Sequence, residues 1–248
     1  WSSDVCSSDL YNEYQIRKDE PVNARYYYRT NGLVNLDKSN MPSYQPEAYQ
    51  KPGCPIIVDL NGDGQITVED VDMKNVIPSL YWGLGNTFTY KNWDLDVFIY
   101  SQLGVDKYND VYSWTSGRGL GNQTNNMSVY IKDVWHSELN PNGTIPGIAY
   151  EMASVSLPGG AGTDIGYENS SFVRVRNITL GYNFKPNQLG TLSKLLSGIR
   201  VYVDVQNPFT FTGYTGLDPE VNTGGNYKGG KAEYPQTRTF SLGTKLSF

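Results

Sequence analysis

The chain has 248 residues, of which 18% are charged, and its formal net charge of −5 gives no basic field that would attract nucleic acid. Aromatic residues make up 13%, with 20 Tyr, and there are 26 Gly. No apolar run approaches the ~20 residues that a membrane-spanning helix needs. A helical membrane protein is therefore excluded, whereas a membrane β-barrel, whose strands alternate and give a weak hydropathy signal, is not.

The first ten residues, WSSDVCSSDL, have neither the basic region nor the apolar stretch of a signal peptide. They resemble a translated cloning adaptor, so residues 1–10 are interpreted as non-native and residues 11–248 as the protein itself. On this interpretation Cys54 is the only native cysteine. A disulfide between Cys6 and Cys54 is the alternative, but two cysteines in so long a chain make no disulfide framework.

Five segments alternate apolar and polar residues with the period of half-exposed β-strands. They are Leu80–Tyr90 and residues 93–102, 172–184, 199–207 and 239–248. The polar pair Lys91-Asn92 joins the first two as a hairpin, and each strand has roughly the ~9–11 residues that cross a bilayer. In the third segment the apolar parity switches, which predicts a bulge near Asn177. Residues 24–30, with three consecutive tyrosines, are a candidate earlier strand.

Short connections at 91–92 and 185–198 alternate with long ones at 103–171 and 208–236, an asymmetry typical of outer-membrane barrels. The alternating faces have two interpretations. In a β-sandwich the apolar face packs a core, whereas in a barrel it meets lipid and the polar face lines the interior. Aromatic residues at strand ends (Trp82, Tyr90, Trp93 and Tyr100) favour the barrel.

Residues 59–70 follow the spacing of a twelve-residue calcium loop. The predicted ligands are Asp59, Asn61, Asp63, the carbonyl of Gln65 and, at position twelve, Asp70. A bidentate Glu is usual at position twelve, so the shorter Asp70 predicts weak, structural binding of Ca²⁺, with Kd around 10⁻⁴–10⁻³ M. The alternative is an Asx-rich turn that holds itself together by hydrogen bonds from its own backbone.

Residues that could form a catalytic site are scarce, and no enzyme activity is expected. His136 is the only histidine, and neither a G-x-S-x-G motif nor a phosphate-binding glycine loop is present. Asp94 and Asp96 lie on one face of a predicted strand, where exposure to solvent or a barrel interior explains them more simply than glycoside hydrolysis. The glycine-rich stretch 213–230 is interpreted as a mobile loop.

An ordered series of motifs resembles the SusC/RagA-type TonB-dependent outer-membrane transporters. The resemblance covers about residues 13–248, and its most specific block is Ser171-Phe172-Val173-Arg174-Val175-Arg176-Asn177-Ile178-Thr179-Leu180-Gly181-Tyr182. It also rests on Pro52-Gly53, Asp59-Leu60-Asn61-Gly62-Asp63-Gly64, the hairpin from Tyr81-Trp82-Gly83 to Trp93-Asp94-Leu95, the stretch 135–146, Asp204-Val205-Gln206-Asn207-Pro208-Phe209 and Tyr214-Thr215-Gly216-Leu217-Asp218-Pro219-Glu220. Cys54-Pro55 departs from the family, which more often has an acidic residue followed by an aliphatic one.

The resemblance implies an all-β fold, in which this chain supplies the last antiparallel strands of a 22-stranded transmembrane barrel with long extracellular loops, without the plug domain or upstream strands. It implies uptake of oligosaccharides or peptides across the Gram-negative outer membrane with a SusD-like lipoprotein, powered by the TonB complex. It also implies contact with membrane lipid and recognition by the barrel-assembly machinery through Phe240, Leu242, Leu246 and Phe248. Substrate-binding residues remain unassigned, and the alternative function is a secreted, calcium-stapled β-sandwich binding module.

Overall fold

The computed structural model describes residues 24–109, 112, 127–147, 157–158, 162–221 and 234–248. The chain divides into two compact units. The first, called here the sheet unit, comprises residues 78–105, 169–222 and 233–248, and the second comprises residues 1–77, 106–168 and 223–232. The segment 1–10, with Cys6, lies outside the described residues, so its predicted foreign origin stays a prediction.

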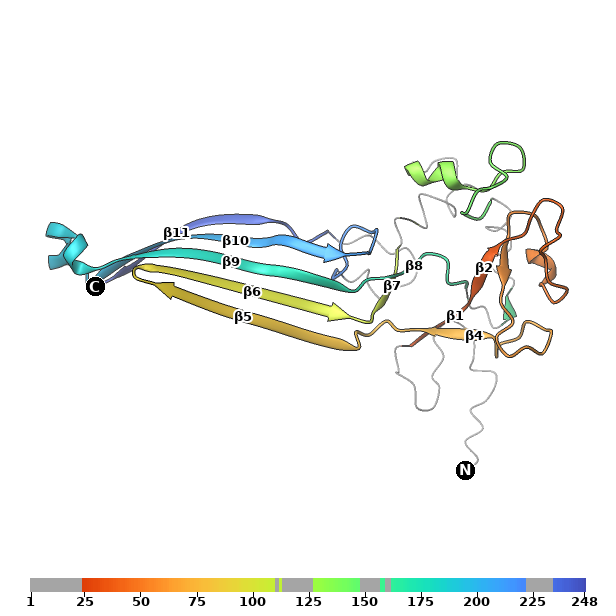
Figure 1. The fold of residues 1–248 in the computed structure, drawn as a ribbon, viewed down its shortest axis with the longest axis horizontal. Coiled ribbons are helices and arrows are strands. Elements are labelled where there is room, and N and C mark those ends of the chain that lie inside the picture. The colour runs from red at the N-terminus through yellow and green to blue at the C-terminus, as the bar shows by residue number, and fades with distance from the viewer. Residues whose placement is uncertain (1–23, 110–111, 113–126, 148–156, 159–161, 222–233) are drawn as a thin grey trace, which may run out of the picture. The chain divides into compact units, whose positions relative to one another are not determined.

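The sheet unit is built on one antiparallel sheet of five strands in the order β11-β10-β9-β6-β5 (Figure 1). The strands are β5 (Leu80–Tyr90), β6 (Trp93–Leu103), β9 (Phe172–Phe184), β10 (Gly198–Thr212) and β11 (Thr239–Ser247). Each of the five overlaps a segment whose alternation predicted a strand. The expected all-β, antiparallel fold is thus confirmed for the described residues.

The bulge predicted near Asn177 is present. The pairing of β9 with β6 shifts between Phe98 and Ile99, because Asn177 faces Phe98 and Val175 faces Ile99, which leaves Arg176 as the extra residue. This extra residue returns Val175 to the same face as the apolar residues that follow in β9. The parity switch in the sequence is therefore a feature of the strand and not an interruption of it.

The fourth strand is longer than its sequence pattern predicts. The alternation ended at Asn207, because Pro208 cannot donate to a strand ladder, but β10 runs on to Thr212. The register shifts between Gln206 and Phe209, and Asn207 has a positive φ of 50° there, so Pro208 lies in a bulge where no ladder hydrogen bond is required. The long connection after β10 therefore starts at residue 213 and not at residue 208.

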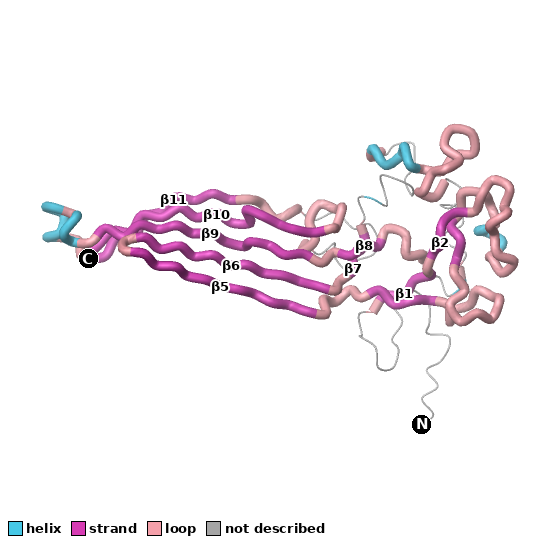
Figure 2. Tube along the Cα trace, viewed as in Figure 1, coloured by secondary structure: helices cyan, strands magenta, loops and turns pink. Residues whose placement is uncertain are grey.

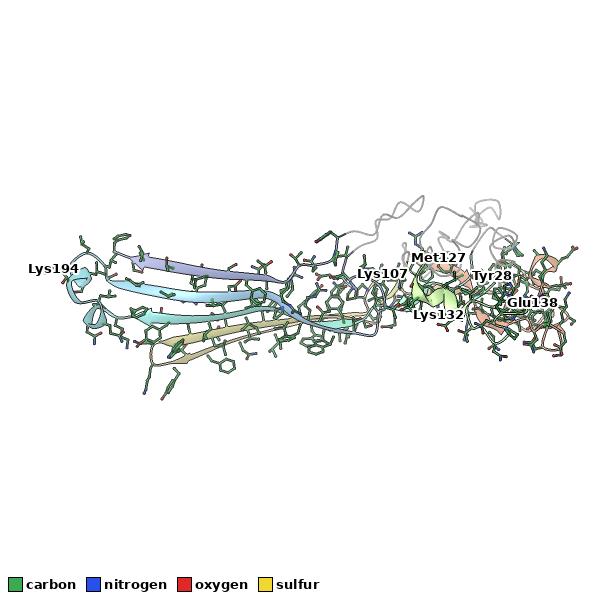
Figure 3. All side chains as sticks on the ribbon, turned by 90° about the horizontal axis from the view of Figure 1, so that it is seen from above. Tyr28, Lys107, Met127, Lys132, Glu138 and Lys194 are labelled. Carbon is green, nitrogen blue, oxygen red and sulfur yellow. The ribbon has the colours of Figure 1, made fainter. Side chains whose placement is uncertain are left out.

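The connections alternate in length as predicted. At one end of the sheet, two residues join β5 to β6, and residues 185–197, with the 3-10 turns η6 (Pro186–Gln188) and η7 (Gly190–Lys194), join β9 to β10. Figure 3 shows Lys194 at this end. At the opposite end of the sheet, β6 and β10 end and β9 and β11 begin, and the long connections 104–171 and 213–238 join them in sequence.

The second unit contains short strands (Figure 2), and its core is rich in tyrosine. The strand β1 (Arg25–Tyr28) pairs with β4 (Val71–Lys74), β2 (Thr30–Leu33) with β3 (Pro55–Ile57), and β7 (Asp106–Tyr108) with β8 (Tyr167–Asn169). The described residues of this unit also include the 3-10 segments η2 (Glu47–Tyr49) and η4 (Val129–Asp133). The core includes Tyr26, Tyr28, Tyr49, Cys54 and Ile57, of which Cys54 is a buried free thiol.

Two motifs far apart in the sequence meet in this unit. Gly53 has a positive φ of 80°, and a Cβ atom there would lie 2.3 Å from the ring of Trp135. The carbonyl of Gly53 also accepts a hydrogen bond of 3.0 Å from the amide of Gly147. Part of the long connection between β6 and β9 is thus packed structure. Among the described residues, no helix has the length and apolar character needed to cross a membrane.

Candidate functional site: the two faces of the sheet and its loops

The register of the five strands sorts their side chains onto one apolar and one polar face. Residues that pair across an antiparallel sheet point to the same side. Phe88, Leu95, Leu180, Val203 and Leu242 form one continuous row across all five strands. The neighbouring row on the opposite face is Thr87, Asp96, Thr179, Asp204 and Ser241. Figure 3 shows side chains projecting from both sides of the strands.

The apolar face is not covered by any part of the chain that the structure describes. Phe88 is 59% exposed, Leu180 44% and Leu242 76%. In a β-sandwich these side chains would form the buried core. Their exposure therefore contradicts the sandwich alternative and fits a face that meets lipid.

Aromatic residues form a band at each end of the apolar face, with mainly aliphatic residues between the bands. Tyr90, Trp93, Tyr182 and Phe184 lie at the end with short connections, where the rings of Trp93 and Tyr182 pack edge-on with centroids 4.8 Å apart. Trp82, Phe209 and Phe211 lie at the other end. Such bands mark the two interfaces of a membrane-spanning barrel.

The polar face carries paired charges. Arg200 of β10 forms an ion pair with Asp94 of β6, with Nε of Arg200 donating to Oδ1 of Asp94 at 3.1 Å. Two further bonds link threonine hydroxyls to carboxylates, from Thr179 to Asp204 at 2.6 Å and from Thr87 to Asp96. The prediction that Asp94 and Asp96 share the polar face is confirmed, and hydrogen bonds to neighbouring strands account for both.

At the long-loop end, Arg174 of β9 lies on the polar face and is only 1% exposed. Its Nη2 donates to both carboxylate oxygens of Asp218 at 2.9 and 3.0 Å, and its Nη1 donates to Glu220 at 2.5 Å. Its Nε donates to the hydroxyl of Thr210 at 2.9 Å. Every N–H-bearing nitrogen of the guanidinium thus has an acceptor, and the group also lies over the ring of Phe172.

Sequence reasoning missed this network. Arg174 and Asp218 lie in separate sequence motifs that give no sign of their pairing, and residues 213–230 were interpreted as a mobile loop. That interpretation is wrong for residues 213–221, since Asp218 and Glu220 are tied to β9. The usable signal was an arginine at an alternating strand position together with an Asp-Pro-Glu run, because a buried arginine needs carboxylate partners.

The predicted calcium loop is held together by its own polar side chains. Asp59 accepts from the amides of Gly62 and Gly64 at 2.7 and 2.8 Å, Asn61 from the amide of Asp63 at 2.9 Å, and Asp63 from the amide of Gln65 at 2.8 Å. Among the described residues, no group of three or more His, Cys, Asp or Glu side chains is gathered closely enough to hold a metal ion.

Asp70, the predicted twelfth ligand, is fully buried. Its Oδ1 accepts from the amides of Leu60 and Asn61, and its Oδ2 accepts from the amide and hydroxyl of Thr67. A carboxylate has about four acceptor positions, so Asp70 has none left for a metal. Burial alone would raise its pKa, but the hydrogen bonds from Thr67, Leu60 and Asn61 outweigh burial and hold the pKa below its usual range. Asp59, with two bonds, keeps spare acceptor positions.

The loop is fixed to the core of the second unit through Tyr28. Its hydroxyl lies 2.9 Å from the carbonyls of both Thr67 and Pro158. Burial, together with the nearby charge of Asp70, raises the pKa of Tyr28 well above its ordinary value. Asp70 therefore acts as a structural clamp, and the calcium assignment stays a prediction that rests on Asp59, Asn61, Asp63 and the carbonyl of Gln65.

The predicted assembly-signal residues lie at the edge of the sheet. Phe240, Leu242 and Leu246 are paired with Val205, Val203 and Ile199 on the apolar face, and Phe248 follows β11 with 90% of its surface exposed. Their recognition by the assembly machinery remains a prediction.

Comparison with known proteins agrees with this geometry. No protein-family model matches the chain. TonB-dependent receptor P3 of Formosa agariphila is 28% identical over 242 residues, covering 94% of this chain and 23% of the relative. TonB-dependent receptor SusC of Bacteroides thetaiotaomicron is 34% identical over 208 residues, covering 82% of this chain and 19% of the relative. The chain thus spans about a fifth of the length of these relatives.

The fold is shared with a solved structure. The RagAB peptide transporter superposes over 91% of this chain and 22% of its own with a TM-score of 0.61, at 22% sequence identity. The matches and the two-faced sheet define the chain as a segment of a TonB-dependent receptor, a protein of the Gram-negative outer membrane. Within that class it belongs to the SusC/RagA type. Receptors of this class are not enzymes, which supports the expectation of no catalysis at the family level.

Proposed function

We propose that the complete receptor imports oligosaccharides or peptides across the outer membrane, working with a SusD-like lipoprotein and energised by the TonB complex. The likeness to SusC and to the RagAB peptide transporter supports this function. The proposal rests on the two different faces of the sheet. The apolar face is exposed and suited to lipid, and the opposite face carries the charged residues Asp94, Asp96, Arg200 and Asp204. In a closed barrel that polar face lines the interior through which cargo passes.

The test of import is growth. The gene is deleted in the source bacterium, and growth is compared on single oligosaccharides and on peptides as the limiting nutrient. Loss of growth on one nutrient class, restored by the intact gene but not in a strain lacking TonB, supports energised import. Unchanged growth and uptake on every nutrient tested contradicts it. Co-purification of a lipoprotein from solubilised outer membranes tests the proposed partner separately.

We further propose that the loop 59–70 binds Ca²⁺ weakly and in a structural role. Asp59, Asn61, Asp63 and the carbonyl of Gln65 would hold the ion, and an oxygen-only donor set of this kind suits a hard cation. Asp63 is exposed and Asp59 is half-buried, which supports access of an ion from the surface. The commitment of Asp70 to four protein donors argues for an affinity at the weak end of the predicted range.

A further inference from the structure

The loop that follows β10 is fixed to the sheet by a buried group of charges. Asp218 is 8% exposed and Arg174 is 1% exposed, so both charges have been removed from water. A charge buried in this way is tolerated only when it is paired and fully hydrogen-bonded. The guanidinium of Arg174 meets this condition, because its Nη2 donates to Asp218 and its Nη1 donates to Glu220.

The carboxylates also organise the backbone of the loop. Asp218 accepts hydrogen bonds from the amides of Glu220 at 2.8 Å and Gln236 at 3.0 Å, so it joins the outgoing and the returning arm of the connection. Glu220 receives a second arginine, with Nη1 of Arg176 at 2.9 and 3.0 Å from its two oxygens. Two arginines and two carboxylates leave the group electrically neutral.

The two bulges of the sheet place these arginines. Arg176 is the extra residue where β9 shifts register against β6, and the same stretch of β9 faces Asn207 and Pro208, where β10 shifts register. Without these shifts the residues of β9 that precede Arg176 would lie on the opposite face. Arg174 would then point to the apolar face, away from Asp218.

The segment between the anchors is exposed. Tyr214 and Asp218 are both 8% exposed, while Leu217 between them is 59% exposed. The buried residues hold the segment from both sides and leave Thr215 and Leu217 at the surface. A loop that ordered only on binding cargo would lack such anchors.

We propose that Arg174 is a positioning residue that locks residues 213–221 over the polar face at the long-loop end of the sheet, so that this segment is a preformed part of the cargo-facing surface before any cargo binds. The location on the polar face comes from the strand register. The description of that surface as cargo-facing rests on the import function proposed above.

The test is hydrogen–deuterium exchange on the full-length receptor, purified in detergent without cargo and followed by mass spectrometry. The amides of Glu220 and Gln236 should be protected in the wild type, because the carboxylate of Asp218 accepts from both. Arg174→Gln should speed exchange of residues 213–221 by about ten-fold or more, while β5 and β6 keep their wild-type rates. Arg176→Gln is the matched control, since Arg176 is 42% exposed and contacts only Glu220 of the two carboxylates, and it should change exchange far less.

The proposal is overturned if residues 213–221 exchange as fast in the wild type as an unstructured peptide, or if Arg174→Gln leaves their exchange unchanged. If Arg174→Gln does not assemble, Thr210→Val and Glu220→Gln decide, because both keep the arginine. Thr210→Val removes the acceptor of its Nε, and Glu220→Gln removes the negative charge opposite its Nη1. Both should speed exchange of the segment by a smaller factor, and wild-type rates in both would refute the lock. Exchange is measured without cargo, so a failure of import would not be mistaken for a failure of the lock.

Discussion

Arg200 reaches Asp94 across an intervening strand, over the one residue there that has no side chain. Asp94 pairs in register with Gly181 of β9, and Gly181 also pairs with Tyr202 of β10. A Cβ atom on Gly181 would lie 2.5 Å from a carboxylate oxygen of Asp94 and 2.7 Å from Nε of Arg200. Glycine at this position thus makes room for an ion pair that ties β6 to β10.

This arrangement predicts that Gly181→Ala destabilises the receptor. The added methyl group would push Arg200 and Asp94 apart within a packed polar layer, and overpacking of this kind costs about 1–3 kcal/mol. Thermal unfolding of the detergent-solubilised full-length receptor should show a lower Tm. Gly85→Ala is the control, because its Cβ atom would come no closer than 3.8 Å to Phe98. Equal Tm values for the two variants would refute the role given to Gly181.

The two faces of β11 predict opposite outcomes for two neighbouring arginine substitutions. Leu242 lies on the apolar face and Ser241 on the polar face. An arginine on a lipid-facing strand costs about 2–4 kcal/mol near the middle of the bilayer, whereas an arginine in a polar interior does not pay that cost. Leu242→Arg should therefore lower the amount of folded receptor in the outer membrane, and Ser241→Arg should leave it near the wild-type level. A larger loss for Ser241→Arg would reverse the assignment of the faces.

Asp70 should stabilise the loop 59–70 in a pH-dependent way. Its pKa is lower in the folded protein than in the unfolded chain, so its contribution is present above the unfolded pKa and is lost as the pH falls through the folded pKa. Asp70→Asn leaves some donors without an acceptor, which costs about 1–3 kcal/mol at neutral pH. Amide exchange at Leu60 and Thr67 should quicken in this variant, and less in Asp63→Asn, whose side chain is exposed. Identical exchange in both variants would remove Asp70 as the clamp.

Calcium should slow amide exchange at Gly62 and Gly64 when it is added to the full-length receptor at around 10⁻³ M, the weak end of the range for such loops. Asp59 lies next to both amides and keeps spare acceptor positions. Asp59→Asn should abolish the calcium effect. Magnesium at the same concentration is the control, since it demands a stricter octahedral geometry. The absence of any calcium effect up to about ten times that concentration would leave the loop as a self-bonded turn.

The strands of the sheet could be predicted because the alternation of apolar and polar residues that marks each strand lies within one short stretch of sequence. Alternation along each strand located β5, β6, β9 and β11, and the parity switch located the bulge at Asn177. The end of β10 could not be predicted from alternation. Proline normally ends a strand because it has no backbone N–H to donate, and only the bulge at Pro208 removes the need for that hydrogen bond.

Long-range pairs lay beyond the reach of the sequence. Nothing in the spacing shows that Arg174 meets Asp218, or that the ring of Trp135 lies against Gly53, because such contacts depend on how distant segments return to each other. The calcium-like motif fixed the positions of the oxygen-bearing residues. It could not show that Asp70 would give all its acceptor positions to backbone and hydroxyl donors.

We infer that these strands form part of a closed outer-membrane barrel. The most direct test of this inference uses the full-length gene product, expressed with its own signal sequence in a Gram-negative host. Outer-membrane fractions are run on a denaturing gel with and without boiling. We expect the receptor in the outer-membrane fraction, migrating differently before and after boiling, because a closed barrel resists detergent until it is heated. A soluble product that migrates identically in both samples would contradict it.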